Sequence, residues 1–171
     1  LLSTTGDANQ LIADVFAVRS DFYRDKPNIV KGLVEGIFLG MELAKTDEGK
    51  AKAAELMAVG FSLSSADCAS MMNDAHVTNF AENVKFFTDP NFGANFERTW
   101  QSASYVYRAY GSIGTPVRSD EVKDASIIQT LQREGKFAES QDTYIKPVTA
   151  KAAQSFKNLE ENLRGHGMKL A

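Results

Sequence analysis

The stretch that most restricts the fold of this chain lies at residues 11–43, LIADVFAVRSDFYRDKPNIVKGLVEGIFLGMEL. Residues 15–18, Val-Phe-Ala-Val, form the only dense run of β-branched and aromatic residues, which favours a buried β-strand. A lone strand leaves its backbone N–H and C=O groups unbonded, so a strand here needs a neighbouring strand. No second run of this kind follows, and the chain begins with Leu1 instead of methionine. We therefore expect these residues to be part of a larger protein.

The same stretch has a second interpretation. Leu11, Ile12, Val15 and Phe16 also share one face of a helix, so residues 11–18 are compatible with a short amphipathic helix. The pattern of apolar residues does not decide between strand and helix, and both interpretations stay open.

A clear amphipathic helix is predicted after Pro27, which suits the first turn because proline lacks the N–H that would be unbonded there. Its apolar stripe recurs at three- and four-residue steps and comprises Ile29, Val30, Leu33, Val34, Ile37, Phe38 and Met41. Gly32, Gly36 and Gly40 follow one another on an adjacent face, although each glycine costs about 1 kcal/mol relative to alanine. This spacing predicts that another backbone packs closely against the glycine ridge.

Further helices are predicted from residues that commonly cap a helix at its first turn. These are Thr46, Ser64, Thr78, Ser119 and Thr149. The aromatic residues between Phe96 and Tyr110 recur at four- and three-residue steps, and Gly111 stands where a helix commonly ends. Residues 135–147 are polar and weakly patterned, which indicates a linker. We therefore expect a mainly α chain with one or two strands.

Composition excludes several classes of function. The net charge is −3 and the isoelectric point about 5.4, and no basic stripe is present, so we expect no nucleic-acid partner. No run approaches the roughly 20 apolar residues that cross a bilayer, so no membrane span is expected in this chain. The first residues show no charged segment followed by an apolar one, so we expect that no signal peptide remains. The single cysteine, Cys68, excludes an internal disulfide framework.

Catalytic and metal-binding residues are sparse. His76 and His166 are the only histidines, and they lack the repeated ligand spacing of a metal site. We interpret His76 as the end of a helix and His166 as part of a solvated tail, and Cys68 as a small buried apolar residue. No glycine loop for phosphates is present. We therefore expect no catalytic residue, no metal and no cofactor, and hence no enzyme.

The most informative polar cluster lies near the beginning of the chain. Ser3, Thr4, Thr5 and Asp7 surround Gly6 in a short loop, where hydroxyls and free backbone N–H groups are able to hold an anion. The alternative is that Asp7 caps whatever element follows. The residue types support both interpretations equally.

Taken in order, these segments resemble the C-terminal half of periplasmic solute-binding proteins of the taurine, sulfonate and nitrate class, which deliver small ligands to ABC importers. The resemblance depends on order and spacing over roughly residues 2–131. The segments that carry it are 13–19 (ADVFAVR), 21–22 (DF), 26–27 (KP), 29–36 (IVKGLVEG), 79–87 (NFAENVKFF), 100–111 and 116–131.

The resemblance implies the type 2 periplasmic binding fold, in which two α/β lobes close about a hinge around the solute. Residues 2–134 would then be the C-terminal part of the binding domain, comprising the return of the hinge and helices of the first lobe. Residues 135–171 would be a linker and a terminal amphipathic helix. The missing first half would supply the neighbours of the strand at residues 15–18.

The same resemblance implies a function. Ser3, Thr4, Thr5 and Asp7 would lie nearest the cleft and contact a small anionic solute, and the partners would be the membrane subunits of an importer. The chain would act in the periplasm, without catalysis. The alternative is a helical interaction module that binds another protein through the glycine ridge and the last helix. An enzyme on a related fold is a third hypothesis, which the absence of a histidine or cysteine constellation disfavours.

Overall fold

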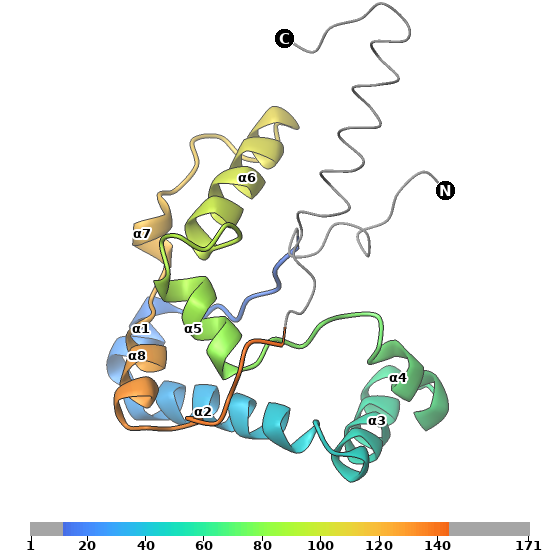
Figure 1. Cartoon of the computed structure of the whole chain (residues 1–171). Coiled ribbons are helices and arrows are strands. Elements are labelled where there is room, and N and C mark those ends of the chain that lie inside the picture. The colour runs from blue at the N-terminus through green and yellow to red at the C-terminus, as the bar shows by residue number, and fades with distance from the viewer. Residues whose placement is uncertain (1–11, 144–171) are drawn as a thin grey trace, which may run out of the picture.

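The computed structural model describes residues 12–143, and these residues are mainly helical, as the sequence predicts. They form eight helices, shown in Figure 1. The helices are α1 (Ser20–Asp25), α2 (Pro27–Leu43), α3 (Asp47–Phe61), α4 (Ser65–Met71), α5 (Phe80–Thr88), α6 (Phe96–Ala109), α7 (Ser119–Val122) and α8 (Ser126–Arg133).

The strand predicted at residues 15–18 does not form. Residues 12–19 are neither strand nor helix and are exposed, with 78% of Phe16 and 52% of Val15 accessible to solvent. The strand and the alternative helix were therefore both wrong for this segment. The physical reason is that residues 12–143 contain no other strand, so a strand at 15–18 has nothing with which to form a ladder.

Helix α2 is the longest helix of the described chain and begins at Pro27, as predicted. Only part of its apolar stripe is covered. Val30 and Phe38 are buried, whereas Ile29 and Leu33 are more than half exposed. Only one side of the predicted apolar stripe therefore faces the core. Other elements pack against only one side of α2. The spacing of apolar residues in the sequence does not show how much of the apolar stripe such packing will cover.

The predicted neighbour of the glycine ridge is also missing from the described residues. A Cβ atom built at Gly32, Gly36 or Gly40 would meet nothing within 4 Å. The glycines are thus accommodated in α2 without a close backbone contact from residues 12–143. Each glycine lowers the stability of the helix, and no close packing within the described residues offsets this cost.

The main core lies where α2, α5 and α8 meet. Its buried members are Phe38, Phe80, Ile128 and Leu131. Phe38 meets Phe80 edge to face, with ring centroids 5.1 Å apart and an interplanar angle of 88°. Such a pair contributes about 0.5–1.5 kcal/mol beyond the area it buries, so it joins α2 firmly to α5.

Two of the predicted caps are confirmed. The hydroxyl of Thr46 accepts a hydrogen bond from the backbone N–H of Gly49, and that of Ser64 accepts one from Asp67. The cap predicted at Thr78 was wrong by one residue. Asn79 caps α5 instead, because its side chain accepts from the N–H of Glu82 while the Glu82 carboxylate accepts from the N–H of Asn79.

The aromatic helix is confirmed as α6, and Gly111 follows it with a φ of 71°, the left-handed conformation expected there. The cap predicted at Ser119 was wrong, because Arg118 is the N-cap of α7 and Ser119 is its first helical residue. The chain forms α7 and α8 with a break between them, at which the Asp124 carboxylate accepts the N–H of Ser126. A short acidic side chain that bonds the backbone locally competes with helix continuation.

Helices α3 and α4 form a hairpin that stands beside the rest of the chain (Figure 1). Ala54 and Cys68 are buried in this hairpin, so the prediction of a buried Cys68 is confirmed. The left-handed backbone of Ser62, with a φ of 56°, ends α3 and turns the chain toward α4. Among residues 12–143, no helix combines the length and apolar character that crossing a bilayer requires.

After α8 the chain turns back across α2 toward the beginning of α5 (Figure 1). We call residues 136–143 the return segment. Gly135, with a φ of 71°, permits the turn, and the Phe137 ring lies 5.1 Å from that of Phe80. The boundary predicted between residues 134 and 135 stays a prediction. The helix predicted from Thr149 lies outside the described residues.

Candidate functional site

The four residues predicted to contact a ligand, Ser3, Thr4, Thr5 and Asp7, lie outside the described residues. The structure begins to describe the chain at Ile12, at the exposed segment that leads into α1. Within residues 12–143, two other places bring polar side chains together. One is a groove beside α6, and the other is a buried carboxylate at the beginning of α5.

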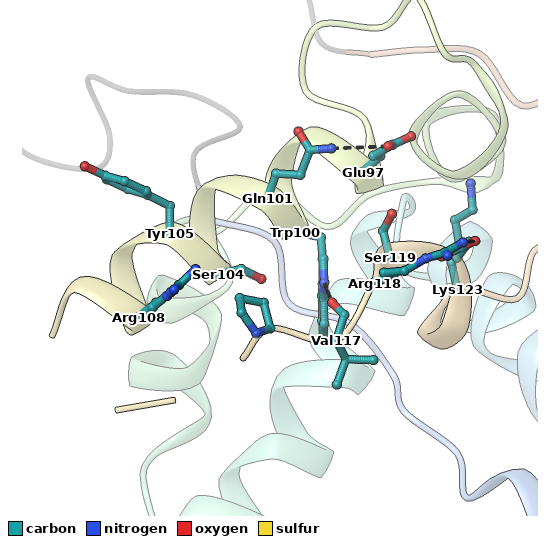
Figure 2. A pocket seen from close by; sticks show the side chains of 12 residues that line it. Glu97, Trp100, Gln101, Ser104, Tyr105, Arg108, Val117, Arg118, Ser119 and Lys123 are labelled. Carbon is teal, nitrogen blue, oxygen red and sulfur yellow. Dashed lines mark hydrogen bonds and ion pairs between the residues drawn. The ribbon is translucent and has the colours of Figure 1, made fainter. Parts of the chain in front are cut away.

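The groove lies between α6 and the segment that leads into α7, and its volume is about 670 Å³. Figure 2 shows Trp100 and Val117 between the polar residues of α6 and those of α7. The lining residues are Glu97, Trp100, Gln101, Ser104, Tyr105, Arg108, Pro116, Val117, Arg118, Ser119, Asp120 and Lys123.

Aromatic packing fixes the wall formed by α6. Phe96 is buried, and Trp100 follows it by one turn of the helix with its ring stacked on that of Phe96, at a centroid distance of 5.9 Å. Phe96 in turn stacks on Phe87 of α5 at 5.5 Å. The groove is thereby connected to α5 through three rings in series.

A hydrogen bond fixes the opposite wall. The indole Nε1–H of Trp100 donates to the carbonyl oxygen of Val117 over 2.8 Å. This bond joins the segment between Pro116 and α7 to α6. Trp100 therefore contacts both walls of the groove, through its ring on one side and its indole N–H on the other.

The charges around the groove are mixed. Arg118 forms ion pairs with Asp120 and Glu121, and its guanidinium lowers the pKa of Asp120 while the pKa of Arg118 rises. Lys123 donates to the carbonyl oxygen of Phe87 over a long 3.4 Å. Arg108 forms no ion pair with any described residue. The groove can thus offer a cation to an anionic group, although most of its lining is exposed.

The second polar cluster centres on Glu82, whose side chain is only 5% exposed. Its Oε2 accepts from the backbone N–H of Asn79 at 2.9 Å and lies 2.8 Å from Nε2 of His76. Its Oε1 accepts from both the backbone N–H and the hydroxyl of Thr143, at 2.8 and 2.7 Å. A buried carboxylate is stable when its oxygens are satisfied in this way.

These contacts determine the pKa of Glu82. Burial raises that pKa, but the hydrogen bonds from Thr143, His76 and Asn79 lower it by more, so the net shift is downward. The carboxylate is therefore ionised at neutral pH and acts only as an acceptor.

Sequence reasoning missed this cluster. His76 was interpreted as the end of a helix, whereas it lies in the loop between α4 and α5 and contacts Glu82. Asn79 and Glu82 have the three-residue spacing of a capping box, which was a usable signal for the start of α5. The contact with Thr143 could not be predicted from neighbouring residues, because it joins residues that are 61 positions apart in the sequence.

Neither place has the composition of a metal site. Within residues 12–143, no group of three or more histidine, cysteine, aspartate or glutamate side chains comes close enough to hold a metal ion. Comparisons with protein-family models, with curated proteins and with solved structures find no match to the chain.

Proposed function

We propose that this chain is the C-terminal part of the solute-binding component of an ABC importer, and that it captures a small anionic solute outside the cytoplasmic membrane. In this proposal the complete protein has the two-lobed α/β fold, the chain catalyses no reaction, and its partners are the membrane subunits of the importer. The observation that carries the proposal is the exposed segment at residues 12–19.

That segment has the composition of a buried strand in an exposed setting. Ile12, Val15, Phe16 and Val18 are all exposed, and no described residue covers them. Burying these side chains against a sheet would stabilise the fold by about 25 cal/mol per Å² of apolar surface. A sheet supplied by another part of the protein would explain both the exposed side chains and the unused backbone groups.

The chemistry of the residues before this segment supports an anionic solute. Ser3, Thr4 and Thr5 carry hydroxyl groups, and the loop predicted around Gly6 would leave backbone N–H groups free to bind an oxyanion. Neutral donors of this kind hold a small anion and release it again, which a transport protein requires.

The test is a set of thermal unfolding measurements on the complete protein that contains these 171 residues, with taurine, methanesulfonate and nitrate, each at 1–10 mM. Saturable binding of one of these solutes is expected to raise the Tm by several degrees, because a ligand that binds only the folded state stabilises it by mass action. Sodium chloride at equal ionic strength provides the reference for general salt effects.

Matched variants assign the effect to the predicted loop. Thr4→Val and Thr5→Val remove a hydroxyl at nearly constant volume and are expected to abolish the ligand-dependent rise in Tm. Thr99→Val, on α6 and outside the groove, is the control and is expected to retain it. The proposal is wrong if no anion raises the Tm above the chloride reference, or if the loop variants respond as the control does.

A specific observation also favours the second candidate, a helical interaction module. Among residues 12–143, eight hydrophobic residues are buried, whereas 22 large hydrophobic residues are exposed. Apolar surface on this scale is typical of an unfilled protein interface. Sedimentation velocity distinguishes the candidates, since an interaction module is expected to self-associate or to bind a partner without added anion, whereas a monomer that responds only to the anion supports solute capture.

A further inference from the structure

The return segment is attached to the helices by two different kinds of contact. At its first end, the Phe137 ring packs against Phe38 and Phe80, with centroid distances of 5.6 and 5.1 Å, and Lys136 pairs with Glu35 of α2 at 2.9 Å. At its far end, all the described contacts are polar. The two ends therefore respond differently to conditions that alter charge.

The polar end is concentrated on the beginning of α5. The side-chain N–H of Asn79 donates to the carbonyl oxygen of Gln141 at 2.7 Å, and Ser140 Oγ accepts from the N–H of Ala81 at 3.1 Å. Thr143 makes its two hydrogen bonds to the same oxygen of Glu82. The buried Glu82 carboxylate thus accepts hydrogen bonds both from Asn79, at the cap of α5, and from Thr143, at the end of the return segment.

The ionised Glu82 carboxylate has four hydrogen-bonding partners: the backbone N–H groups of Asn79 and Thr143, the hydroxyl of Thr143 and Nε2 of His76. Protonation removes the charge that strengthens these bonds, and the new O–H has to donate, either to Nε2 of His76 or to the hydroxyl of Thr143. The backbone N–H of Asn79 is held by the helix, whereas Thr143 lies at the exposed end of the return segment. Protonation therefore weakens both hydrogen bonds of Thr143, the partner that is least held by other contacts.

We infer that the return segment is a strap released by acid, whose far end separates from α5 when Glu82 is protonated while Phe137 remains in the core. Release uncovers the beginning of α5 and the loop that holds His76.

Other titratable and charged groups surround Glu82. His76 faces it from the preceding loop, and the ion pair between Lys85 of α5 and Asp142 of the return segment lies near it, at 2.8 Å. The pKa of Glu82 lies below its ordinary value of 4.5, so release is expected below about pH 4.5.

The test is an NMR titration of the full chain between pH 7 and pH 3, following the Glu82 carboxyl carbon and the backbone amides. The amides of Ser140 and Thr143 are expected to change with the same midpoint as the Glu82 carboxyl, while those of Phe38 and Leu131 retain their folded shifts. The inference is overturned if the Thr143 amide does not titrate, or if all four amides change together as the chain unfolds.

Variants separate Glu82 from its neighbours. Asp142→Asn is expected to leave the midpoint of the Thr143 amide in place, whereas Glu82→Gln removes the titration. Thr143→Val keeps the fold, because it loses one hydroxyl at an exposed position, and is expected to raise the midpoint of the Glu82 carboxyl by about one pH unit. Glu82 is rejected as the trigger if Asp142→Asn shifts the midpoint of the Thr143 amide. It is also rejected if Thr143→Val leaves the midpoint of the Glu82 carboxyl unchanged.

Discussion

The hydroxyl oxygen of Tyr23 lies 2.9 Å from the Oγ of Ser126, so the beginning of α8 is joined to α1 across 103 residues. At the other end of α8, the ammonium of Lys31 pairs with the carboxylate of Glu134 at 2.5 Å. These two contacts fix α8 at both ends relative to α1 and α2, and they orient Ile128 and Leu131 toward the core. The core is thus assembled from distant parts of the chain.

We predict that Phe38→Ala lowers the free energy of unfolding by about 3–5 kcal/mol, because it removes the edge-to-face contact with Phe80 and leaves a cavity between α2 and α5. Urea denaturation followed by circular dichroism measures the change. Leu39→Ala, at the next and half-exposed position of the same helix, is the control and is expected to cost far less. Equal losses for the two variants would contradict the position of the core.

Stability is expected to decrease below about pH 4.5, and Glu82 is expected to cause part of this decrease. Its pKa is lower in the folded state than in the unfolded state, so the carboxylate stabilises the fold above the unfolded value. That contribution is lost as the pH falls through the folded value. Urea denaturation between pH 7 and pH 3 measures it, and Glu82→Gln should flatten the profile relative to Glu97→Gln, an exposed control.

Removal of the cap at the beginning of α5 is expected to destabilise the chain. Asn79→Ala loses the acceptor for the N–H of Glu82 and the donor to Gln141, which together correspond to about 1–2 kcal/mol. Asn91→Ala, at an exposed position in the following loop, is expected to change the free energy of unfolding by less than about 0.5 kcal/mol. If the two variants are equally stable, Asn79 does not cap α5.

Trp100→Phe tests the hydrogen bond that joins the two walls of the groove. The variant retains an aromatic ring to stack on Phe96 but loses the donor to Val117. Amide hydrogen exchange of residues 117–120 is expected to accelerate, and that of the core residue Leu131 is expected to stay unchanged. Unaltered exchange at residues 117–120 would show that other contacts hold this wall.

Two glycines are expected to respond to alanine in opposite directions. Gly36→Ala adds a methyl group where nothing lies within 4 Å and improves helix propensity, so it should stabilise the isolated chain by about 1 kcal/mol. Gly135→Ala forces alanine into a left-handed conformation and should destabilise it by about 1 kcal/mol. A loss of stability for Gly36→Ala would instead indicate that a close neighbour covers the glycine ridge.

Local signals in the sequence predicted much of the helical structure. Pro27, Thr46 and Ser64 mark helix starts that the structure confirms, and Gly111 marks the end of α6. These signals succeed because the capping interactions involve residues within one turn of each other. The break at Asp124 was missed because the same side chain that favours a cap can also interrupt a helix.

The remaining features depend on contacts between distant residues. No local pattern distinguishes Val30, which is buried, from Ile29, which is exposed, since both belong to the same apolar stripe. The Glu82 cluster is invisible for the same reason, because half of its hydrogen bonds come from Thr143. The predicted ligand loop at Ser3, Thr4, Thr5 and Asp7 lies outside the described residues and stays a prediction.

The three rings of Phe38, Phe80 and Phe137 also set an order of events during synthesis. The ribosome adds about 5–20 residues per second, so α2 and α5 emerge several seconds before Phe137 can pack against them. During that interval the Phe38 and Phe80 rings are able to meet each other but lack their third neighbour. The core between α2 and α5 is therefore completed only after the return segment has been synthesised.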